Sequence, residues 1–231
     1  MTAALQAIVF DFDGVIADSE PLHLRAFQQV LASEGIELTR SEYFSQYLGF
    51  DDVGMFEALA RDRGIQLDTR RIAALVAEKG LALQEMMRAD SVLFPGAKAF
   101  LQAAAAAVPI AVASGALRHE IDEIVHAAGI APLFTTIVAA GDTPESKPSP
   151  APYELAFRQL RERTGRTLDP RKTVAIEDSR WGLESARGAG LRLVGVTNSY
   201  PAHELPGAEL IAGGLGDLTL EALDDLCRTT A

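Results

Sequence analysis

Two aspartates, Asp11 and Asp13, stand two residues apart in the stretch AIVFDFDGVIADSE at 7–20, directly after a short apolar run. Carboxylates this close together repel each other unless a cation or a shared proton is present. Such a pair can divide nucleophilic attack from the accompanying proton transfer. A calcium loop of the EF-hand kind is a poorer fit, because Val15 stands where a third ligand would be needed.

Three further groups with possible chemistry follow later apolar runs. Ser114 and Gly115 come after the run at 110–113, Lys147 lies in GDTPESKPSP, and Glu177 and Asp178 come after the run at 174–176. Each has an ordinary alternative explanation: a Ser-Gly turn, an exposed loop lysine and a helix cap. In an open parallel sheet, ligands bind outside the carboxyl ends of the strands. If the runs are strands of one sheet, these groups meet at one edge.

The apolar pattern predicts such a sheet. Short, continuous apolar runs are typical of strands buried on both faces, and segments with helical spacing lie between them. Alternation of strands and helices predicts βαβ units with helices on both faces. The predicted strands are 5–10, 110–113, 136–140, 174–176 and 193–196, and the predicted helices between them are 98–107, 118–128, 153–163 and 183–189.

Residues 18–90 break this alternation, because they contain helical patterns at 21–33, 52–63 and 69–87 but no convincing strand. Ser19 is expected to cap the first of these helices, with Pro21 in its first turn. The fold class is therefore α/β, with a doubly wound, Rossmann-like parallel-sheet core. The predicted core comprises 1–16 and 92–231, and an all-helical domain at 17–91 is inserted after the first strand.

Composition limits the classes of function. The chain has 231 residues, of which 48% are hydrophobic, enough for a well-buried core. Its net charge of −11 argues against a general nucleic-acid binder but does not exclude a small anionic substrate. No apolar run is long enough to span a membrane, and residues 1–16 do not resemble a signal peptide. The only cysteine, Cys227, cannot form an internal disulfide, so we expect a cytoplasmic protein.

The motifs DFDGV, ASG, KPSP and EDS occur in this order, with the helical insert between the first and the second. Together they resemble the haloacid dehalogenase superfamily, in its phosphatase and phosphomutase branch, over essentially the whole chain. The insert is similar in position to the helical cap of phosphoglycolate phosphatases and β-phosphoglucomutase. The resemblance implies a phosphatase that acts on a small phosphorylated metabolite, either a sugar phosphate or a phosphoglycolate-like ester. It implies neither a nucleic-acid nor a membrane partner, and the oligomeric state stays open.

The resemblance also implies a catalytic role for each motif. Asp11 would be the nucleophile that forms an aspartyl-phosphate. Asp13 would protonate the leaving oxygen and then activate water. Lys147 would neutralise the transferring phosphoryl group and the Asp11 carboxylate, while Ser114 and the amide of Gly115 would bind phosphoryl oxygens at a helix start.

A Mg²⁺ cofactor is implied in the same way, because substrate and nucleophile are both anions. Its expected ligands are an oxygen of Asp11, the backbone carbonyl of Asp13 and the carboxylate of Asp178. Glu177 would be either a further ligand or an outer partner of the ligands, and the sequence leaves both alternatives open.

Four more residues are expected to bind substrate. The resemblance aligns Lys79 with a cap lysine that reaches the active site of β-phosphoglucomutase, and His23 with the cap-hinge histidine of that enzyme. Lys79 could instead extend its ammonium to solvent from an apolar helix face, and His23 could be a hydrogen-bonded interface residue. Gly49, in the cap loop, and Arg118, after the second strand, complete the predicted substrate-binding set.

Asp52 is a departure from the family pattern. The stretch YLGFDDVGMF resembles a cap loop in which the mutase carries a phosphate-binding arginine, but Asp52 takes that place here. A phosphomutase must hold a second phosphate, which an aspartate would repel. Hydrolysis is therefore favoured, with a hexose-phosphate phosphomutase as the alternative. Asp13 argues against true dehalogenation, and a non-catalytic binding protein stays open.

Overall fold

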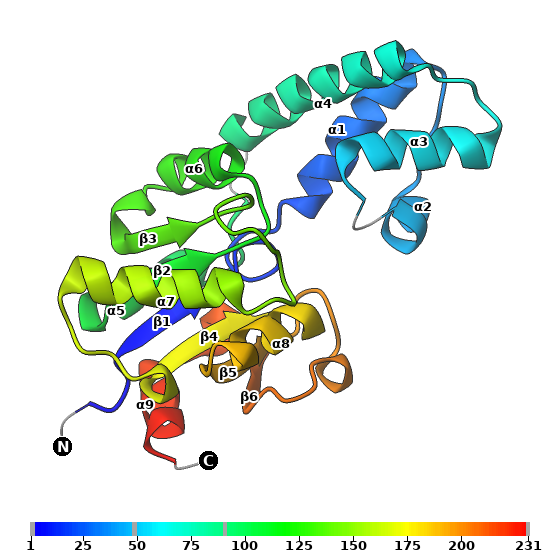
Figure 1. Cartoon of the computed structure of the whole chain (residues 1–231). Helices are drawn as coiled ribbons and strands as arrows, with labels where there is room; N and C mark the ends of the chain where they lie inside the picture. The colour runs from blue at the N-terminus through cyan, green and yellow to red at the C-terminus, as the bar shows by residue number, and fades with distance from the viewer. Residues whose placement is uncertain (1–2, 48–49, 90–91, 230–231) are drawn as a thin grey trace. The chain divides into compact units, whose positions relative to one another are not determined.

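The computed structural model describes residues 3–47, 50–89 and 92–229, and the chain divides into two compact units (Figure 1). The first comprises Met1–Asp18 and Ser91–Ala231, and the second comprises Ser19–Asp90. The first unit contains the sheet, whereas the described elements of the second are all helices. The structure confirms the α/β fold class with an all-helical insert after the first strand.

The sheet has six parallel strands in the order β3-β2-β1-β4-β5-β6. This is the doubly wound order, in which the chain builds outward from β1 first on one side and then on the other. The order in which the chain adds strands therefore reverses between β1 and β4, which pair directly and in parallel. The strands are β1 Ala7–Phe10, β2 Ile110–Ala113, β3 Phe134–Val138, β4 Thr173–Glu177, β5 Arg192–Val196 and β6 Leu210–Ala212.

Helices cover both faces of this sheet. Residues Ala7 and Val9 face a core made with α7 and α8, whereas the ring of Phe10 packs edge-on against Phe100 of α5 at 6.2 Å between centroids. Alternate strand residues thus bury opposite faces, which explains the continuous apolar runs. The longer helices of the unit are α5 Ala97–Ala107, α6 Arg118–Ala127, α7 Ala151–Thr164, α8 Arg180–Gly188 and α9 Leu220–Arg228.

Five strands were predicted and all five are present, with differences at their ends. β3 lies two residues nearer the N-terminus than the predicted 136–140. β6 was not predicted: its apolar run Leu210–Ala212 is only three residues long, and it forms an edge strand that is only partly buried. α8 begins at Arg180, before the predicted 183, because the hydroxyl of Ser179 accepts a hydrogen bond from the amide of Gly182 and caps the helix.

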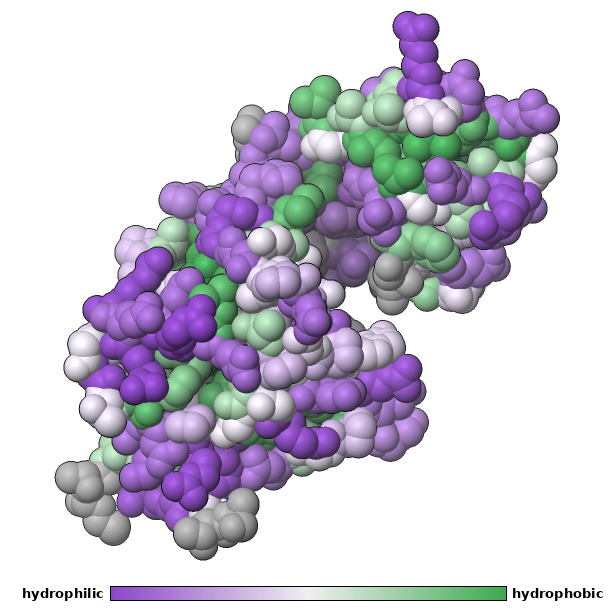
Figure 2. Space-filling model, viewed as in Figure 1, coloured by the Kyte–Doolittle hydropathy of each residue, from purple (hydrophilic) through white to green (hydrophobic). Residues whose placement is uncertain are grey.

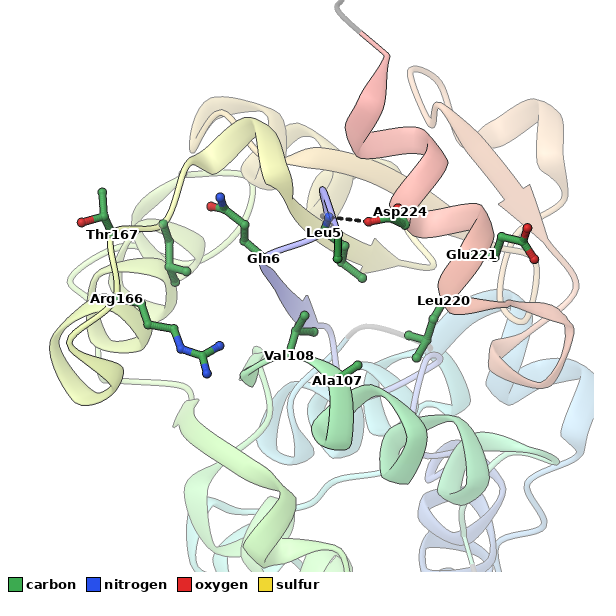
Figure 3. A pocket seen from close by; sticks show the side chains of 11 residues that line it. Leu5, Gln6, Ala107, Val108, Arg166, Thr167, Leu220, Glu221 and Asp224 are labelled. Atoms are coloured by element: carbon green, nitrogen blue, oxygen red, sulfur yellow. Dashed lines mark hydrogen bonds between the residues drawn. The ribbon is translucent and has the colours of Figure 1, made fainter. Parts of the chain in front are cut away.

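The amino end of the sheet is closed by α9. The Asp224 carboxylate accepts hydrogen bonds from the amides of Ala4 and Leu5, at 2.5 and 2.9 Å. Figure 3 shows the bond from Leu5. Beside this contact lies a pocket of about 600 Å³ whose lining includes Leu5, Val108 and Leu220. Because β1 starts here, this pocket is at the opposite end of the sheet from the strand ends that carry the motifs.

The second unit consists of α1 Glu20–Ser33, α2 Arg40–Glu42, a π-helical turn Tyr43–Tyr47, α3 Asp52–Arg63 and α4 Thr69–Ala89 around its own apolar core. Hydrophobic residues also show on its visible face in Figure 2. Among its described residues, Phe50, Val53 and Leu81 are large and exposed. The predicted cap at Ser19 is wrong. Its backbone is helical (φ −80°, ψ −25°) instead of extended, so its side chain makes no capping hydrogen bond. In the described part of the chain, no helix is long and apolar enough to cross a membrane.

Gly96, at the start of α5, offers a test of the packing of the sheet unit. Its φ of +79° is left-handed, and a Cβ there would lie 2.6 Å from the Cα of Gly216. Gly165 also has a left-handed φ, +65°, but a Cβ would meet nothing within 4 Å. We expect Gly165→Ala to lower the free energy of unfolding by about 1 kcal/mol through strain alone.

Gly96→Ala should lower the free energy of unfolding by about 1–3 kcal/mol more than Gly165→Ala does, because it adds a clash with the backbone of Gly216 to the same strain. Urea unfolding of both variants measures the difference. Equal losses would show that the contact with Gly216 relaxes freely.

Candidate active site

The two central strands bring three acidic residues together at the carboxyl end of the sheet. β1 and β4 pair in parallel with Phe10 opposite Ile176, and the Asp11 amide donates to the Ile176 carbonyl at 2.9 Å. Asp11 therefore stands beside Glu177 and Asp178. The carboxylates of these three buried residues each offer an oxygen within 4.8 Å of the other two. The sequence predicted this meeting from the strand ends alone.

Lys147 supplies a positive charge to the cluster. Its Nζ lies 2.6 Å from Oδ1 of Asp11 and 2.5 Å from Oε1 of Glu177, and the side chain is largely buried. The loop that carries Lys147 is tied to α8, because the Ser185 hydroxyl donates to the carbonyl of Ser149 at 2.5 Å. The exposed-loop interpretation of Lys147 is therefore wrong: the lysine crosses from the β3–α7 connection to the ends of β1 and β4.

Burial governs the ionisation of the cluster. It raises the pKa of Asp11 well above its usual value, and the charges of Glu177 and Asp178 add to this, while Lys147 opposes it. Burial, followed by the charge of Glu177, raises the pKa of Asp178 to about 7. Burial works against the Lys147 ammonium, but Asp11 and Glu177 outweigh it and raise the pKa of Lys147. One ammonium faces three carboxylates, so the cluster favours a further cation.

The donor set fits a hard divalent cation such as Mg²⁺. All three side chains offer carboxylate oxygens, which Mg²⁺ prefers. The backbone leaves the carboxylates room at two glycines: a Cβ at Gly14 would lie 1.9 Å from Oδ2 of Asp178, and one at Gly182 would lie 1.8 Å from Oε1 of Glu177. No other residue fits these two positions without displacing a carboxylate of the cluster.

Glu177 has more hydrogen-bond partners than the other acids. Its Oε1 accepts from Lys147 and from the hydroxyl of Tyr153, at 2.5 and 2.8 Å. Its Oε2 accepts from the amide of Asp178 and the hydroxyl of Ser179, at 3.1 and 3.2 Å. Its place in the cluster is compatible with both roles that the sequence left open, direct ligand or outer partner.

The loop after β1 is held by residues that follow β5. The Asn198 side-chain amide donates to the carbonyl of Gly14 at 2.8 Å, and the hydroxyl of Ser199 hydrogen-bonds to Asp178. Asp13 is half-buried in this loop. Sequence reasoning missed Asn198 and Ser199, although the rule that selected the other strand ends applies equally to TNSY after the fifth predicted strand.

The end of β2, which neighbours β1, presents Ser114 and Gly115. Ser114 is buried, and its Oγ accepts from the amide of Ala116 at 2.9 Å. A Cβ at Gly115 would meet nothing within 4 Å, so its backbone faces open space. Arg118 points elsewhere: its guanidinium donates to the Ile137 carbonyl at 2.7 Å and pairs with Asp142 at 2.6 Å, and none of its described contacts involves the carboxylate cluster.

In the helical unit, Lys79, His23 and Asp52 form a second charged group. Lys79 is 1% exposed, so extension to solvent is excluded. Its Nζ lies 2.7 Å from Oδ1 of Asp52, 3.1 Å from Nδ1 of His23 and 4.8 Å from the centroid of the Phe27 ring. Burial, then the charge of Lys79, lowers the pKa of His23 to about 4, so the imidazole is neutral and accepts from the lysine. Gly49 lies outside the described residues.

Comparison with known proteins agrees with this geometry. A family model described as haloacid dehalogenase-like hydrolase matches residues 5–190. Protein CbbY of Cereibacter sphaeroides is 32% identical over 234 residues, covering 94% of this chain and 98% of the relative. A phosphoglycolate phosphatase of Yersinia pseudotuberculosis is 27% identical over 198 residues, covering 85% and 83%.

The fold is also similar to solved structures. A mutant of CbbY from Rhodobacter sphaeroides, in complex with xylulose-(1,5)bisphosphate, superposes with a TM-score of 0.75 and 31% identity, covering 95% of this chain and 99% of the other.

The raised pKa of Asp178 predicts a pH-dependent stability in the metal-free protein. Its folded-state value of about 7 exceeds the unfolded value, so the folded state holds an extra proton between about pH 4 and pH 7. This group's contribution to stability therefore falls as pH rises through that window. Asp178→Asn removes the dependence. With a chelator present, the variant should come close to the wild type near pH 4 and be more stable by up to roughly 4 kcal/mol at pH 8.

Urea unfolding at both pH values measures this effect. Asp225→Asn, at a side chain that is 72% exposed, is the control and should show no such change. A wild-type-minus-variant difference that is the same at both pH values would contradict the raised pKa.

The buried lysine of the helical unit gives a second prediction. Asp52→Asn leaves the Lys79 ammonium without its carboxylate, and we expect the free energy of unfolding to fall by about 2–3 kcal/mol. Adding Lys79→Met should recover most of this loss, since the unpaired charge is then gone. Glu78→Gln, which breaks a more exposed pair with Arg71, should cost no more than about 1 kcal/mol. Additive losses at Asp52 and Lys79 would argue that the pair is not coupled.

Proposed function

The chain belongs to the haloacid dehalogenase-like hydrolase family, and from this membership we propose that it is a Mg²⁺-dependent phosphatase. Its substrate would be a small phosphate monoester, either a sugar phosphate or a phosphoglycolate-like compound. The observation that carries the proposal is the buried cluster of Asp11, Glu177 and Asp178 with Lys147 on two of its members. The phosphoglycolate phosphatase relative and the CbbY complex with a sugar bisphosphate support the substrate class.

The reaction begins at Asp11, whose carboxylate attacks phosphorus and becomes an aspartyl-phosphate. Lys147 lies 2.6 Å from this carboxylate, and its charge reduces the repulsion between nucleophile and phosphate. Asp13 donates a proton to the leaving oxygen and then takes one from the water that hydrolyses the intermediate. Ser114 and the open backbone at Gly115 bind phosphoryl oxygens.

Asp11 and Asp178, with the backbone carbonyl of Asp13 and with Glu177 directly or behind them, would hold the Mg²⁺ ion. When bound, the ion supplies Lewis-acid charge stabilisation for the phosphoryl oxygens. The cluster fits this ion because its acids are buried and Lys147 is their only described cationic partner. The helical unit, which carries His23 and Lys79, acts as the cap, and the cytoplasmic location stays a prediction.

Asp52 makes hydrolysis the better proposal than a hexose-phosphate phosphomutase. A mutase must retain a second phosphate while its intermediate turns over. Asp52 is paired with Lys79, and the two charges compensate each other. This pair therefore offers no uncompensated cation to a second phosphate. We therefore expect the reaction to release free phosphate and not to yield an isomerised ester.

The proposal predicts phosphate release from small monoesters in Mg²⁺. Asp11→Asn should lower kcat by roughly 10³-fold or more, because the amide is no nucleophile. Asp13→Asn should lower kcat by roughly 10²–10⁴-fold through loss of proton transfer. A chelator should abolish turnover and added Mg²⁺ should restore it, while Asp225→Asn should behave as the wild type.

A colorimetric phosphate assay over a panel of monophosphates and bisphosphates measures all of these effects. Full turnover by Asp11→Asn would overturn the proposal. Isomerised ester without free phosphate would assign the mutase reaction instead.

A further inference from the structure

Tyr153 contacts two charged residues of the active site, Glu177 and Lys147. We propose that Tyr153 is a positioning residue, which holds the Lys147 ammonium against Asp11 through Glu177 and through its own ring. The inference rests on the proposed function, since it assigns a role within the same site. No motif in the sequence marks Tyr153, which lies at the third position of α7, six residues after Lys147.

Two contacts define the role. The hydroxyl of Tyr153 donates to Oε1 of Glu177 at 2.8 Å, the same oxygen that accepts from Lys147 at 2.5 Å. The Nζ atom of Lys147 also lies 5.0 Å from the centroid of the Tyr153 ring, within the range of a cation–π interaction. Tyr153 thus fixes the carboxylate that anchors the lysine and also contacts the ammonium itself.

The rigidity of Tyr153 contrasts with the side chain that it contacts. Lys147 has a long, flexible side chain and comes from a loop. Tyr153 is fully buried and belongs to the core between α7 and the sheet, together with Val9, Ala113 and Val138. A group held by packed helices and strands keeps its place better than one on a loop. Through its contacts with Tyr153, the lysine is therefore held in place by a residue that is itself fixed in the core.

The geometry also leaves the lysine free to act. An ammonium has three hydrogens, of which Asp11 and Glu177 each accept one in this structure. The ring face of Tyr153 takes up no classical hydrogen bond, so a third hydrogen is available for a phosphoryl oxygen. Without the Tyr153 hydroxyl, Glu177 loses a donor and can shift, and Lys147 would follow it away from Asp11.

Tyr153→Phe tests this inference, because it keeps the buried ring and removes only the hydroxyl. We expect kcat for the best monophosphate to fall about tenfold with KM within about twofold, since a displaced Lys147 stabilises the transferring phosphoryl group less well. The matched control is Tyr47→Phe, which removes the hydroxyl of another buried tyrosine, bonded to Asp62 at 3.2 Å in the helical unit. Its kcat should stay within about twofold of the wild type. Circular dichroism at the assay temperature establishes that each variant is folded.

A double-mutant cycle separates positioning from simple stability. In a Lys147→Gln background, Tyr153→Phe should change the residual rate by less than about twofold, because the group that it positions is gone. The same tenfold loss in both backgrounds would overturn the inference, as would a wild-type kcat in the single variant.

The result is distinguishable from failure of the proposed function. If the wild type releases phosphate, Asp11→Asn does not, and Tyr153→Phe keeps the wild-type kcat, only the positioning role is contradicted. If the wild type releases no phosphate from any ester, both fall together.

Discussion

Three buried carboxylates that face one ammonium form the constraint on which the rest of the site depends. Such a cluster survives only where hydrogen bonds and cations compensate its charge. The doubly wound topology provides the place, since β1 and β4 pair where the strand order reverses and their carboxyl ends lie together. The local backbone provides the space, through glycines at positions 14 and 182 where a Cβ would strike Asp178 or Glu177. A site that favours a cation is thereby built from strand ends and turns.

In the helical unit, too, a buried charge needs a compensating partner, but here the partner belongs to the unit itself. Lys79 is as buried as the carboxylates of the sheet unit, but its charge is met within the unit by Asp52 and by the neutral His23. The sheet unit keeps an excess of negative charge, which a divalent ion can take up, whereas the helical group is nearly balanced. The sheet unit can therefore bind a cation, whereas the charged group of the helical unit is already paired. The paired Lys79 is the physical reason to favour hydrolysis over a phosphomutase reaction.

Much of the fold could be predicted because its strands are buried on both faces. A strand such as β2 or β4 must be apolar at every position, so its run is visible in the sequence and its last residue locates the polar group that follows. The signal is weak where a strand is very short, as at β6, an edge strand whose apolar run has only three residues. It also fails for caps such as Ser19, whose residue type suits a helix start but whose backbone conformation is set by its surroundings. Tyr153 was read only as part of a helix, since nothing in a single sequence distinguishes a packing tyrosine from one that donates to a buried carboxylate.

Residue types and apolar runs are local properties, so they predict from the sequence alone which chemical groups follow the strands. The sequence thus supplied Asp11, Lys147 and the Glu177–Asp178 pair, along with their expected meeting at one edge. The partners of these groups depend on contacts between distant segments of the fold. Lys147 pairs with Asp11 and Glu177, the Tyr153 hydroxyl donates to Glu177, and Arg118 pairs with Asp142. The reason is that a long side chain can reach several partners from distant segments of the chain, and burial determines how strongly it interacts with each of them. Neither the distances between these side chains nor their burial can be predicted from any one segment of the sequence.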